Sequence, residues 1–434
     1  MVKYKLKKEI GLFQAVLYGV GIILGAGIYA LIGIGAGIAG NALWISFLVG
    51  AFIAAFTGFS YAELSSMYPQ EAAEFVYVNH AFKKELLAFI IQWIMLFTIL
   101  ISTATVALGF GGYWSFLFGG NSISIAVFLV SAMSILNYLG MKDSARFNDI
   151  STIIESFGLL LIVVLGGHYI IKNNVFLSTN FFQSPSGVYG VISATTVLYF
   201  AFIGFESLVN MSEEVKNAEE NIPKALLISL VISALIYVLV SVSAVGVLGS
   251  KALAVSKAPL AETAEKALSG SSIALSLIAL FATSNTVLIS TIVGSRLIYG
   301  LSKNSMFPAV FSRIGKRGTP YMSVLLVAVI SCTSLLIGNL ENLAHMADFG
   351  IFAVYIFVNA SLIALRYSKP DAVRRFKAPL NIGNFPVMAF LGILLNLAMM
   401  YFFDFKTFVY GAFISMIGII AYFAFSYFKN KGGQ

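Results

Sequence analysis

The chain has 434 residues, of which 59% are apolar and 11% are charged, and its mean hydropathy is +0.91. A typical soluble domain is roughly 25% charged. Because so few charges cannot cover so much apolar surface in water, the lipid bilayer must be the solvent. This composition excludes a large soluble catalytic domain, a DNA-binding domain and a secreted disulfide scaffold. The single cysteine, Cys332, excludes an internal disulfide and is predicted to be a packing residue.

The apolar runs predict an all-α integral membrane protein with twelve transmembrane helices. Each span needs about 20 mostly apolar residues, so twelve take roughly 240. No loop is long enough for an independent domain, which makes 1–434 a single transmembrane domain. A short helix on the membrane surface is predicted for Leu260 to Leu268. The twelve predicted spans are 10–38, 42–65, 86–111, 123–140, 147–171, 188–210, 224–249, 272–302, 320–339, 344–366, 385–403 and 407–428.

The basic residues predict the orientation of these spans. If the N-terminus lies in the cytoplasm, 22 of the 27 Lys and Arg residues fall on the cytoplasmic side. This bias agrees with the positive-inside rule, and shifting one helix would invert it downstream. Both termini are therefore predicted to be cytoplasmic, and the net charge of +8 does not indicate a nucleic-acid partner. A signal peptide is the alternative for the basic start, but the apolar stretch is too long for one.

Two of the predicted spans are interrupted near their centres. The first contains Gly25-Ala26-Gly27, and the sixth contains Gly204 and Glu206. Glycine costs about 1 kcal/mol in a helix interior. Close helix packing is one explanation, and it suits Gly33 and Gly37 better than the central glycines. An unwound helix that turns N–H groups and a positive dipole end toward an anionic ligand is the other. The glycine spacing leaves both open.

The two interruptions also indicate how the chain is divided. Paired breaks at corresponding positions of two halves are the sequence mark of a transporter site. Residues 10–171 and 188–366 would form two halves of five helices each. Because five is odd, the halves would have opposite topology. Two extra helices, within 385–428, lie outside this repeat.

Four segments stand out, in this order along the chain: Gly21-Ile-Ile-Leu-Gly25-Ala-Gly27-Ile-Tyr29; Tyr61-Ala-Glu63-Leu-Ser-Ser-Met-Tyr-Pro69; Phe202-Ile-Gly204-Phe-Glu206-Ser, followed by Ser212-Glu213-Glu214-Val-Lys216-Asn217 and Asn221-Ile-Pro223-Lys224-Ala225; and Ser295-Arg296-Leu-Ile-Tyr299, followed by Met306-Phe-Pro308 and Thr319-Pro320. With these segments the chain resembles the amino acid–polyamine–organocation (APC) superfamily of amino acid permeases. The family usually has Gly-Gly where this chain has Ala72-Ala73, and Gly-Ser-Gly where it has Ala26 between glycines.

The resemblance implies the APC (LeuT-like) fold, a 5+5 inverted repeat with discontinuous helices one and six around a midplane site. It implies a transporter and not an enzyme. The substrate carboxylate would take the N–H groups of Ala26 and Gly27 at a helix start, and its ammonium would face the carbonyls of Ile23, Phe200 and Ile203 at the breaks. Phe200 would cover the substrate from outside, with core packing as the alternative. The implied substrate-binding residues are Ile23, Gly25, Ala26, Gly27, Phe200, Ile203 and Gly204.

Carboxylates inside the spans are the candidates for ion coupling, because burying a charge is expensive. Glu155 is predicted either to exchange a proton or a cation during transport, or to remain neutral and hydrogen-bonded between helices five and one. Glu206 is predicted either to couple transport or to bind loose backbone. Glu63 is expected to reach the interface, and Asp348 to have a helix-dipole or interface role. Asn285 is expected to be a pocket group or an interhelical link.

The expected function is secondary active transport of amino acids by alternating access, in symport with protons. The expected substrate is a neutral amino acid, because the predicted lining Trp93 to Ala107 carries no charge. A cationic amino acid or a polyamine is the alternative, as are exchange and uniport in place of symport. A transport-silent sensor or scaffold and a passive channel are alternatives of other classes. We expect no cofactor or metal, H⁺ in preference to Na⁺ as coupling ion, no obligatory protein partner, and a multi-pass protein of the prokaryotic plasma membrane.

Overall fold

The computed structural model describes residues 10–70, 72–212, 215–303, 306–315 and 317–432. The first nine residues, which carry the prediction of a cytoplasmic N-terminus, lie outside these ranges, as do Glu213 and Glu214. The α-helices are α1 (Leu12–Leu24), α2 (Ala26–Ala39), α3 (Leu43–Met67), α4 (Ala73–Phe82), α5 (Glu85–Phe118), α6 (Ser122–Leu139), α7 (Met141–Lys172), α8 (Val175–Ser178), α9 (Gly187–Leu198), α10 (Ala218–Leu248), α11 (Ser250–Val255), α12 (Pro259–Ala267), α13 (Ser272–Lys303), α14 (Tyr321–Ser334), α15 (Leu340–Ser368), α16 (Val387–Met400) and α17 (Phe405–Gly432).

Short elements connect these helices. Two strands of two residues each pair antiparallel, with Asn381 opposite Pro386. The strands are β1 (Asn381–Ile382) and β2 (Phe385–Pro386), and the 3₁₀ helices are η1 (Gly40–Ala42), η2 (Tyr199–Phe202), η3 (Phe205–Met211), η4 (Ala309–Ser312) and η5 (Leu335–Ile337).

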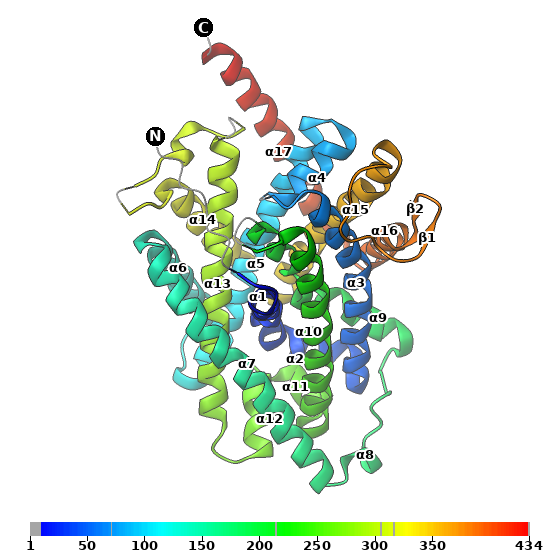
Figure 1. The fold of residues 1–434 in the computed structure, drawn as a ribbon. Helices are drawn as coiled ribbons and strands as arrows, with labels where there is room; N and C mark the ends of the chain where they lie inside the picture. Colours follow the sequence, from blue (N-terminus) through cyan, green and yellow to red (C-terminus); the bar gives the residue numbers. More distant parts are fainter. Residues whose placement is uncertain (1–9, 71, 213–214, 304–305, 316, 433–434) are drawn as a thin grey trace.

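The described residues contain nine helical stretches that are long and apolar enough to cross a membrane. The first of them, Leu12–Met67, holds α1, α2 and α3 together, and α14 and α16 are shorter apolar helices. The all-helical membrane class is therefore confirmed, whereas the count of twelve spans and the inverted repeat remain predictions. Figure 1 shows the long helices as one bundle, with α4 at one end and α8 and α12 at the other.

The first and sixth predicted spans are both interrupted, which is the second of the two alternatives that the glycine spacing left open. Gly25 separates α1 from α2 with φ −31° and ψ −160°. In the sixth, α9 passes into the 3₁₀ helix η2, and Gly204 at φ 127° separates η2 from η3. That positive φ favours glycine, because a side chain would clash with the backbone there. Figure 1 shows α1 and α2 near the centre of the bundle.

Local sequence explains several helix ends. The Asn121 side chain accepts hydrogen bonds from the N–H groups of Ile123 and Ser124, which caps α6. Pro259 occupies the first turn of α12, where its missing N–H costs nothing. The predicted short helix is present, and its position on the membrane surface stays a prediction. Leu260 is fully buried, because α12 packs against α7, α10 and α13.

A β-bridge joins the approach to α1 with the exit from η3. Ile10 and Val215 form an isolated parallel bridge, and the Lys216 N–H donates to the Ile10 carbonyl at 2.9 Å. The segments that precede the first broken span and follow the second are therefore connected by backbone hydrogen bonding, although they lie about 200 residues apart in the chain.

Glu63 lies at the end of the bundle where α4 packs, and it does not reach the interface. Its side chain is 0% exposed and is held by two arginines. Arg366 donates to both carboxylate oxygens, and the Arg374 guanidinium lies 3.0 Å from one of them. The Ala378 N–H also donates to this carboxylate, at 2.8 Å. The interface prediction for Glu63 is wrong, because the chain supplies positive partners to the buried charge.

Candidate functional site

A cavity of about 80 Å³ lies between the two interrupted spans. Every substrate-binding residue predicted from the sequence borders it. The lining also includes Glu206 and residues of α5 and α13. It consists of Gly21, Ile22, Ile23, Gly25, Ala26, Gly27, Ile99, Ser102, Val106, Phe200, Ala201, Ile203, Gly204, Glu206, Ser207, Thr286, Ile289, Ser290 and Val293.

Glycine allows the two breaks to approach each other closely. A Cβ atom on Gly27 would lie 2.6 Å from the Cα of Ala201, and one on Gly204 would lie 2.6 Å from the Cγ2 of Ile22. Both distances are shorter than real Cβ contacts allow. The start of α2 therefore packs directly against η2, with backbone facing backbone. This contact places polar main-chain groups of both halves of the chain around one cavity.

The N–H of Ala26 has a protein partner. It donates to the Thr286 hydroxyl at 3.0 Å, and Thr286 in turn donates to the Ala282 carbonyl at 3.1 Å. The prediction that Ala26 gives its N–H to a substrate carboxylate is therefore corrected, since α13 supplies the acceptor in this structure. Gly27 still lies in the first turn of α2, where N–H groups have no intrahelical acceptor.

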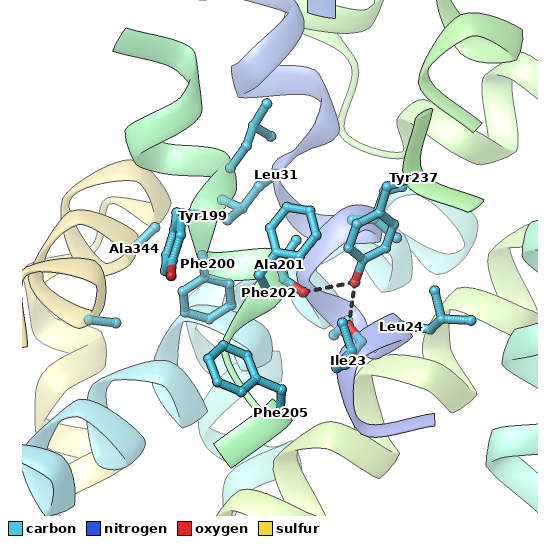
Figure 2. Close-up of a cluster of buried hydrophobic side chains, with 14 of the residues drawn as sticks. Ile23, Leu24, Leu31, Tyr199, Phe200, Ala201, Phe202, Phe205, Tyr237 and Ala344 are labelled. Carbon is cyan, nitrogen blue, oxygen red and sulfur yellow. Dashed lines mark hydrogen bonds between the residues drawn. The ribbon is translucent and has the colours of Figure 1, made fainter. Parts of the chain in front are cut away.

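The carbonyls at the two breaks also have partners, which the sequence did not reveal. The Tyr237 hydroxyl, on α10, donates toward the carbonyls of Ile23 and Ala201. Figure 2 shows this hydroxyl pointing between the two chain segments. The Phe200 carbonyl accepts the Ile203 N–H at 3.2 Å. Of the three carbonyls predicted to face an ammonium group, those of Ile23 and Phe200 already accept one hydrogen bond each.

Phe200 lines the cavity and is 5% exposed. The neighbouring Tyr199 points toward α15 and packs against Phe352 with ring centroids 4.6 Å apart. Figure 2 shows the two side chains on adjacent faces of the same segment, with Ala344 beside Tyr199. Phe200 therefore forms part of the cavity wall, and Tyr199 attaches that wall to α15.

Glu206 combines a cavity position with hydrogen bonds to local backbone. Its Oε2 accepts the Gly204 N–H at 3.0 Å and the Tyr355 hydroxyl at 2.9 Å. The expected bond to loose backbone at the break is thus present. The Tyr355 ring packs against Tyr61 at 5.8 Å, and the Tyr61 hydroxyl donates to Glu74 at 2.9 Å. Aromatic residues therefore connect the cavity carboxylate with a second buried carboxylate on α4.

Glu155 is fully buried on α7, and neither carboxylate oxygen has a hydrogen-bond partner among the described residues. Its backbone carbonyl accepts the Tyr29 hydroxyl at 3.1 Å, which connects α7 to α2. The carboxyl lies close enough to the Tyr29 and Tyr237 hydroxyls to interact with them electrostatically. The hydrogen-bonded alternative is therefore wrong for the side chain, while the link between the two helices exists through the main chain.

The structure contradicts the prediction for Asp348 and confirms the one for Asn285. Asp348 is fully buried, and its oxygens have no hydrogen-bond partner in the described part of the chain. It lies well beyond the first turn of α15, so the expected dipole or interface role is wrong. Asn285 donates to the Thr152 hydroxyl at 3.4 Å, which confirms the predicted link between helices, here α13 and α7.

Sequence reasoning missed Thr286 and Tyr237. Thr286 lies 260 residues from the N–H that it accepts, and Tyr237 lies 214 residues from the Ile23 carbonyl. Threonine and tyrosine are ordinary residues of apolar helices, so neither position carries a pattern of its own. The available signal was indirect, because polar groups at a helix break inside a membrane must find protein partners.

Comparison with known proteins identifies the family. The sequence model of the amino acid permease family matches residues 10–425. The branched-chain amino acid permease BcaP of Bacillus subtilis (strain 168) is 30% identical over 456 residues, covering 99% of this chain and 95% of the relative. The human cystine/glutamate transporter is 28% identical over 99% of this chain and 87% of its own length. The mitochondrial cationic amino acid transporter 3 of Arabidopsis thaliana is 26% identical over 84% and 63%.

These matches cover nearly the whole chain, and they confirm the resemblance that the four sequence segments indicated. The relatives are transporters of different compounds, and none is an enzyme. The chain belongs to the amino acid permease family.

Proposed function

We propose that the protein is a secondary active transporter that moves neutral amino acids across the membrane by alternating access, in symport with protons. The single observation that carries this proposal is the cavity between the two interrupted spans. Its wall joins the first turn of α2 to carbonyls at the ends of α1 and η2. Donors of the first kind suit a carboxylate, and acceptors of the second kind suit an ammonium group.

A neutral substrate is supported by the charges around the cavity. Among the described lining residues, the only ionisable side chain is Glu206. Its Oε2 already accepts two hydrogen bonds, which stabilise it without any substrate cation.

Proton coupling is proposed for Glu155, with Glu206 as the second candidate. A carboxyl group without hydrogen-bond partners inside a membrane protein is stable when protonated and costly when charged. Glu155 also lies near Tyr237, whose hydroxyl contacts both breaks. A change in its charge would therefore be felt where the substrate is proposed to bind.

The proposal also includes a membrane arrangement of twelve spans with two inverted repeats. The protein would lie in the plasma membrane, with both termini in the cytoplasm. This arrangement is supported by the basic residues, 22 of 27 of which would lie on the cytoplasmic side. It is also supported by the placement of the two breaks in corresponding spans of the two halves.

The test is uptake of a panel of labelled amino acids into proteoliposomes, with and without an inward proton gradient. We expect saturable uptake of one or a few neutral amino acids that the gradient stimulates. Uptake only into preloaded vesicles would overturn symport in favour of exchange. Selective uptake of lysine, arginine or a polyamine would overturn the neutral substrate. No flux of any amino acid would overturn the transporter and favour a sensor or scaffold, and unsaturable flux would favour a channel.

A further inference from the structure

One face of α15 carries a row of ionisable and aromatic side chains that runs from the start of the helix to the cavity wall. Its members are spaced by four, three, four and three residues, which places them on one side of an α-helix. They are Glu341, His345, Asp348, Phe352 and Tyr355, here called the α15 row. Because Arg366 in the last turn of α15 binds Glu63 at the α4 end of the bundle, the row begins at the opposite end.

The first part of the α15 row reaches the surface. The Glu341 side chain is 44% exposed, and its Oε1 lies 3.9 Å from Nε2 of His345, whose side chain is 18% exposed. Nδ1 of His345 has no hydrogen-bond partner among the residues that the structure describes. Asp404, just before α17, lies close enough to His345 to interact with it electrostatically. Groups that bind and release protons therefore extend from the surface to one turn before Asp348.

Asp348 is the buried centre of the α15 row. It is 0% exposed, and neither of its carboxylate oxygens has a hydrogen-bond partner within the described ranges. Since burying a charged carboxylate without a partner is costly, the neutral, protonated form of Asp348 is the stable one in this conformation. Glu155 meets the same condition, but it lies on α7 and outside the row. Asp348 thus holds a proton at a position that the proposed coupling through Glu155 does not use.

The Tyr199 hydroxyl lies near both Asp348 and the cavity carboxylate Glu206. It is close enough to interact electrostatically with each of them, and it is itself buried without a hydrogen-bond partner in the described chain. Its ring packs against Phe352 of the row, and Figure 2 shows the side chain beside Ala344, one turn before Asp348. A tyrosine hydroxyl both donates and accepts hydrogen bonds, so it can pass a proton from one carboxyl to the other.

We propose that Asp348 is a proton-carrying residue that supplies Glu206 at the cavity, through the Tyr199 hydroxyl, with protons that enter at the start of α15. Asp348 gives its proton to the Tyr199 oxygen, while the proton already on that oxygen passes to a carboxylate oxygen of Glu206. Asp348 becomes a carboxylate, Glu206 becomes neutral, and Tyr199 is restored. A new proton then reaches Asp348 from the side of His345.

The transfer requires a conformational change. The structure shows no hydrogen bond from Tyr199 to either carboxyl, so the three groups must come closer before a proton can pass. Tyr199 lies on η2, in an interrupted span, where alternating access would move the chain. The inference rests on the proposed proton symport and gives it a route from surface to cavity that is separate from Glu155. In the proposed orientation this route begins outside the cell, where an inward gradient supplies protons.

Asp348→Asn is the direct test, because the amide keeps the size of the side chain and cannot carry the proton. A positioned proton donor speeds its step by about 100-fold or more. Because other steps share control of the transport cycle, the initial rate of uptake driven by a proton gradient should fall about tenfold. Exchange of internal for external amino acid moves no net proton and should keep its rate and its KM. Driven uptake at the unchanged rate would overturn the proposal, as would an equal loss of driven uptake and exchange, which indicates a structural role.

Tyr199→Phe removes the proposed relay and keeps the ring that packs against Phe352. This variant should lose driven uptake and retain exchange, as Asp348→Asn does. Tyr77→Phe is the matched control, because Tyr77 on α4 is equally buried and its hydroxyl also lacks a hydrogen-bond partner among the described residues. It should keep both activities. Full driven uptake in Tyr199→Phe, or the same loss in Tyr77→Phe, would overturn the proposal.

Infrared spectroscopy of the purified protein supplies a readout that does not depend on transport. One absorption band of a protonated carboxyl group should be present in the unchanged protein and absent from Asp348→Asn. Identical carboxyl bands in the two proteins would mean that Asp348 is ionised, which would overturn the proposal. If the unchanged protein shows no uptake stimulated by a proton gradient, the proposed symport itself fails, and the route fails with it whatever the infrared result.

Discussion

Two regions of this protein bury acidic side chains and treat them in opposite ways. At one end of the bundle, Glu63 is held by Arg366, Arg374 and a backbone N–H. At the centre, Glu155 is equally buried but has no hydrogen-bond partner for its carboxylate oxygens among the described residues. A fully compensated charge is costly to disturb, whereas an uncompensated one can lose its charge by taking a proton. The difference separates a structural carboxylate from one that can take part in transport.

The largest effect is expected from breaking the compensated region. Glu63→Gln leaves Arg366 and Arg374 buried without a negative partner, which should lower the free energy of unfolding by about 3–5 kcal/mol. Thermal or denaturant unfolding of the detergent-solubilised protein measures this loss. The exposed pair of Glu219 and Arg375, 3.6 Å apart, provides the control, because Glu219→Gln should cost less than about 1 kcal/mol. Similar losses in both variants would contradict the comparison.

Glu74 is a third buried carboxylate, and it is intermediate between Glu63 and Glu155 because hydrogen bonds stabilise its charge only in part. Burial raises the pKa of Glu74, on α4, from 4.5 to about 7, and nearby Glu206 adds to the rise, while hydrogen bonds from backbone and from Tyr61 partly oppose it. Between these values the unfolded chain loses the proton and the folded protein keeps it. Stability should therefore fall as pH rises from 4.5 to 7, and remain lower above pH 7.

The size of this pH effect is about 3 kcal/mol, from the free energy that corresponds to the change in pKa. Glu74→Gln cannot ionise, so its stability should exceed that of the unchanged protein at a pH above 7 and should lose this part of the pH dependence. Unfolding curves recorded across this range test the prediction, with Glu219→Gln as a variant that keeps the slope. An unaltered slope in Glu74→Gln would contradict the assignment to this carboxyl.

The smallest effect in free energy is expected at Glu155, the buried carboxylate without hydrogen-bond partners in the described part of the chain. There we expect a change in the coupling of transport to protons and not in stability. Glu155→Gln keeps the shape of the side chain but cannot exchange a proton, so stimulation of uptake by a proton gradient should fall about tenfold, equivalent to about 1.4 kcal/mol. Exchange between internal and external amino acid should continue, because it needs no net proton movement. Uptake that responds to the gradient as before would eliminate Glu155 as the coupling group.

The sequence located the positions where the two spans could be broken, but not the hydrogen-bond partners of the groups at the breaks. Gly25 and Gly204 are unusual within apolar helices, and both mark interruptions in the structure. Glu63 was misjudged because its partner Arg366 lies 303 residues further along the chain. Helix periodicity reports which residues are apolar, whereas the pairing of a buried polar group depends on tertiary packing between distant helices. Asp348 was misplaced for the same reason, since its depth in α15 depends on the helices around it.

The backbone bridge between Ile10 and Val215 has a mechanical consequence. It connects the segment before α1 to the segment after η3, with the Lys216 N–H bonded to the Ile10 carbonyl. While that bridge persists, α1 cannot swing outward without pulling on the segment that follows η3. We therefore expect α1 and η3 to move together as one rigid unit. Distance probes placed on each of them should report the same opening rate.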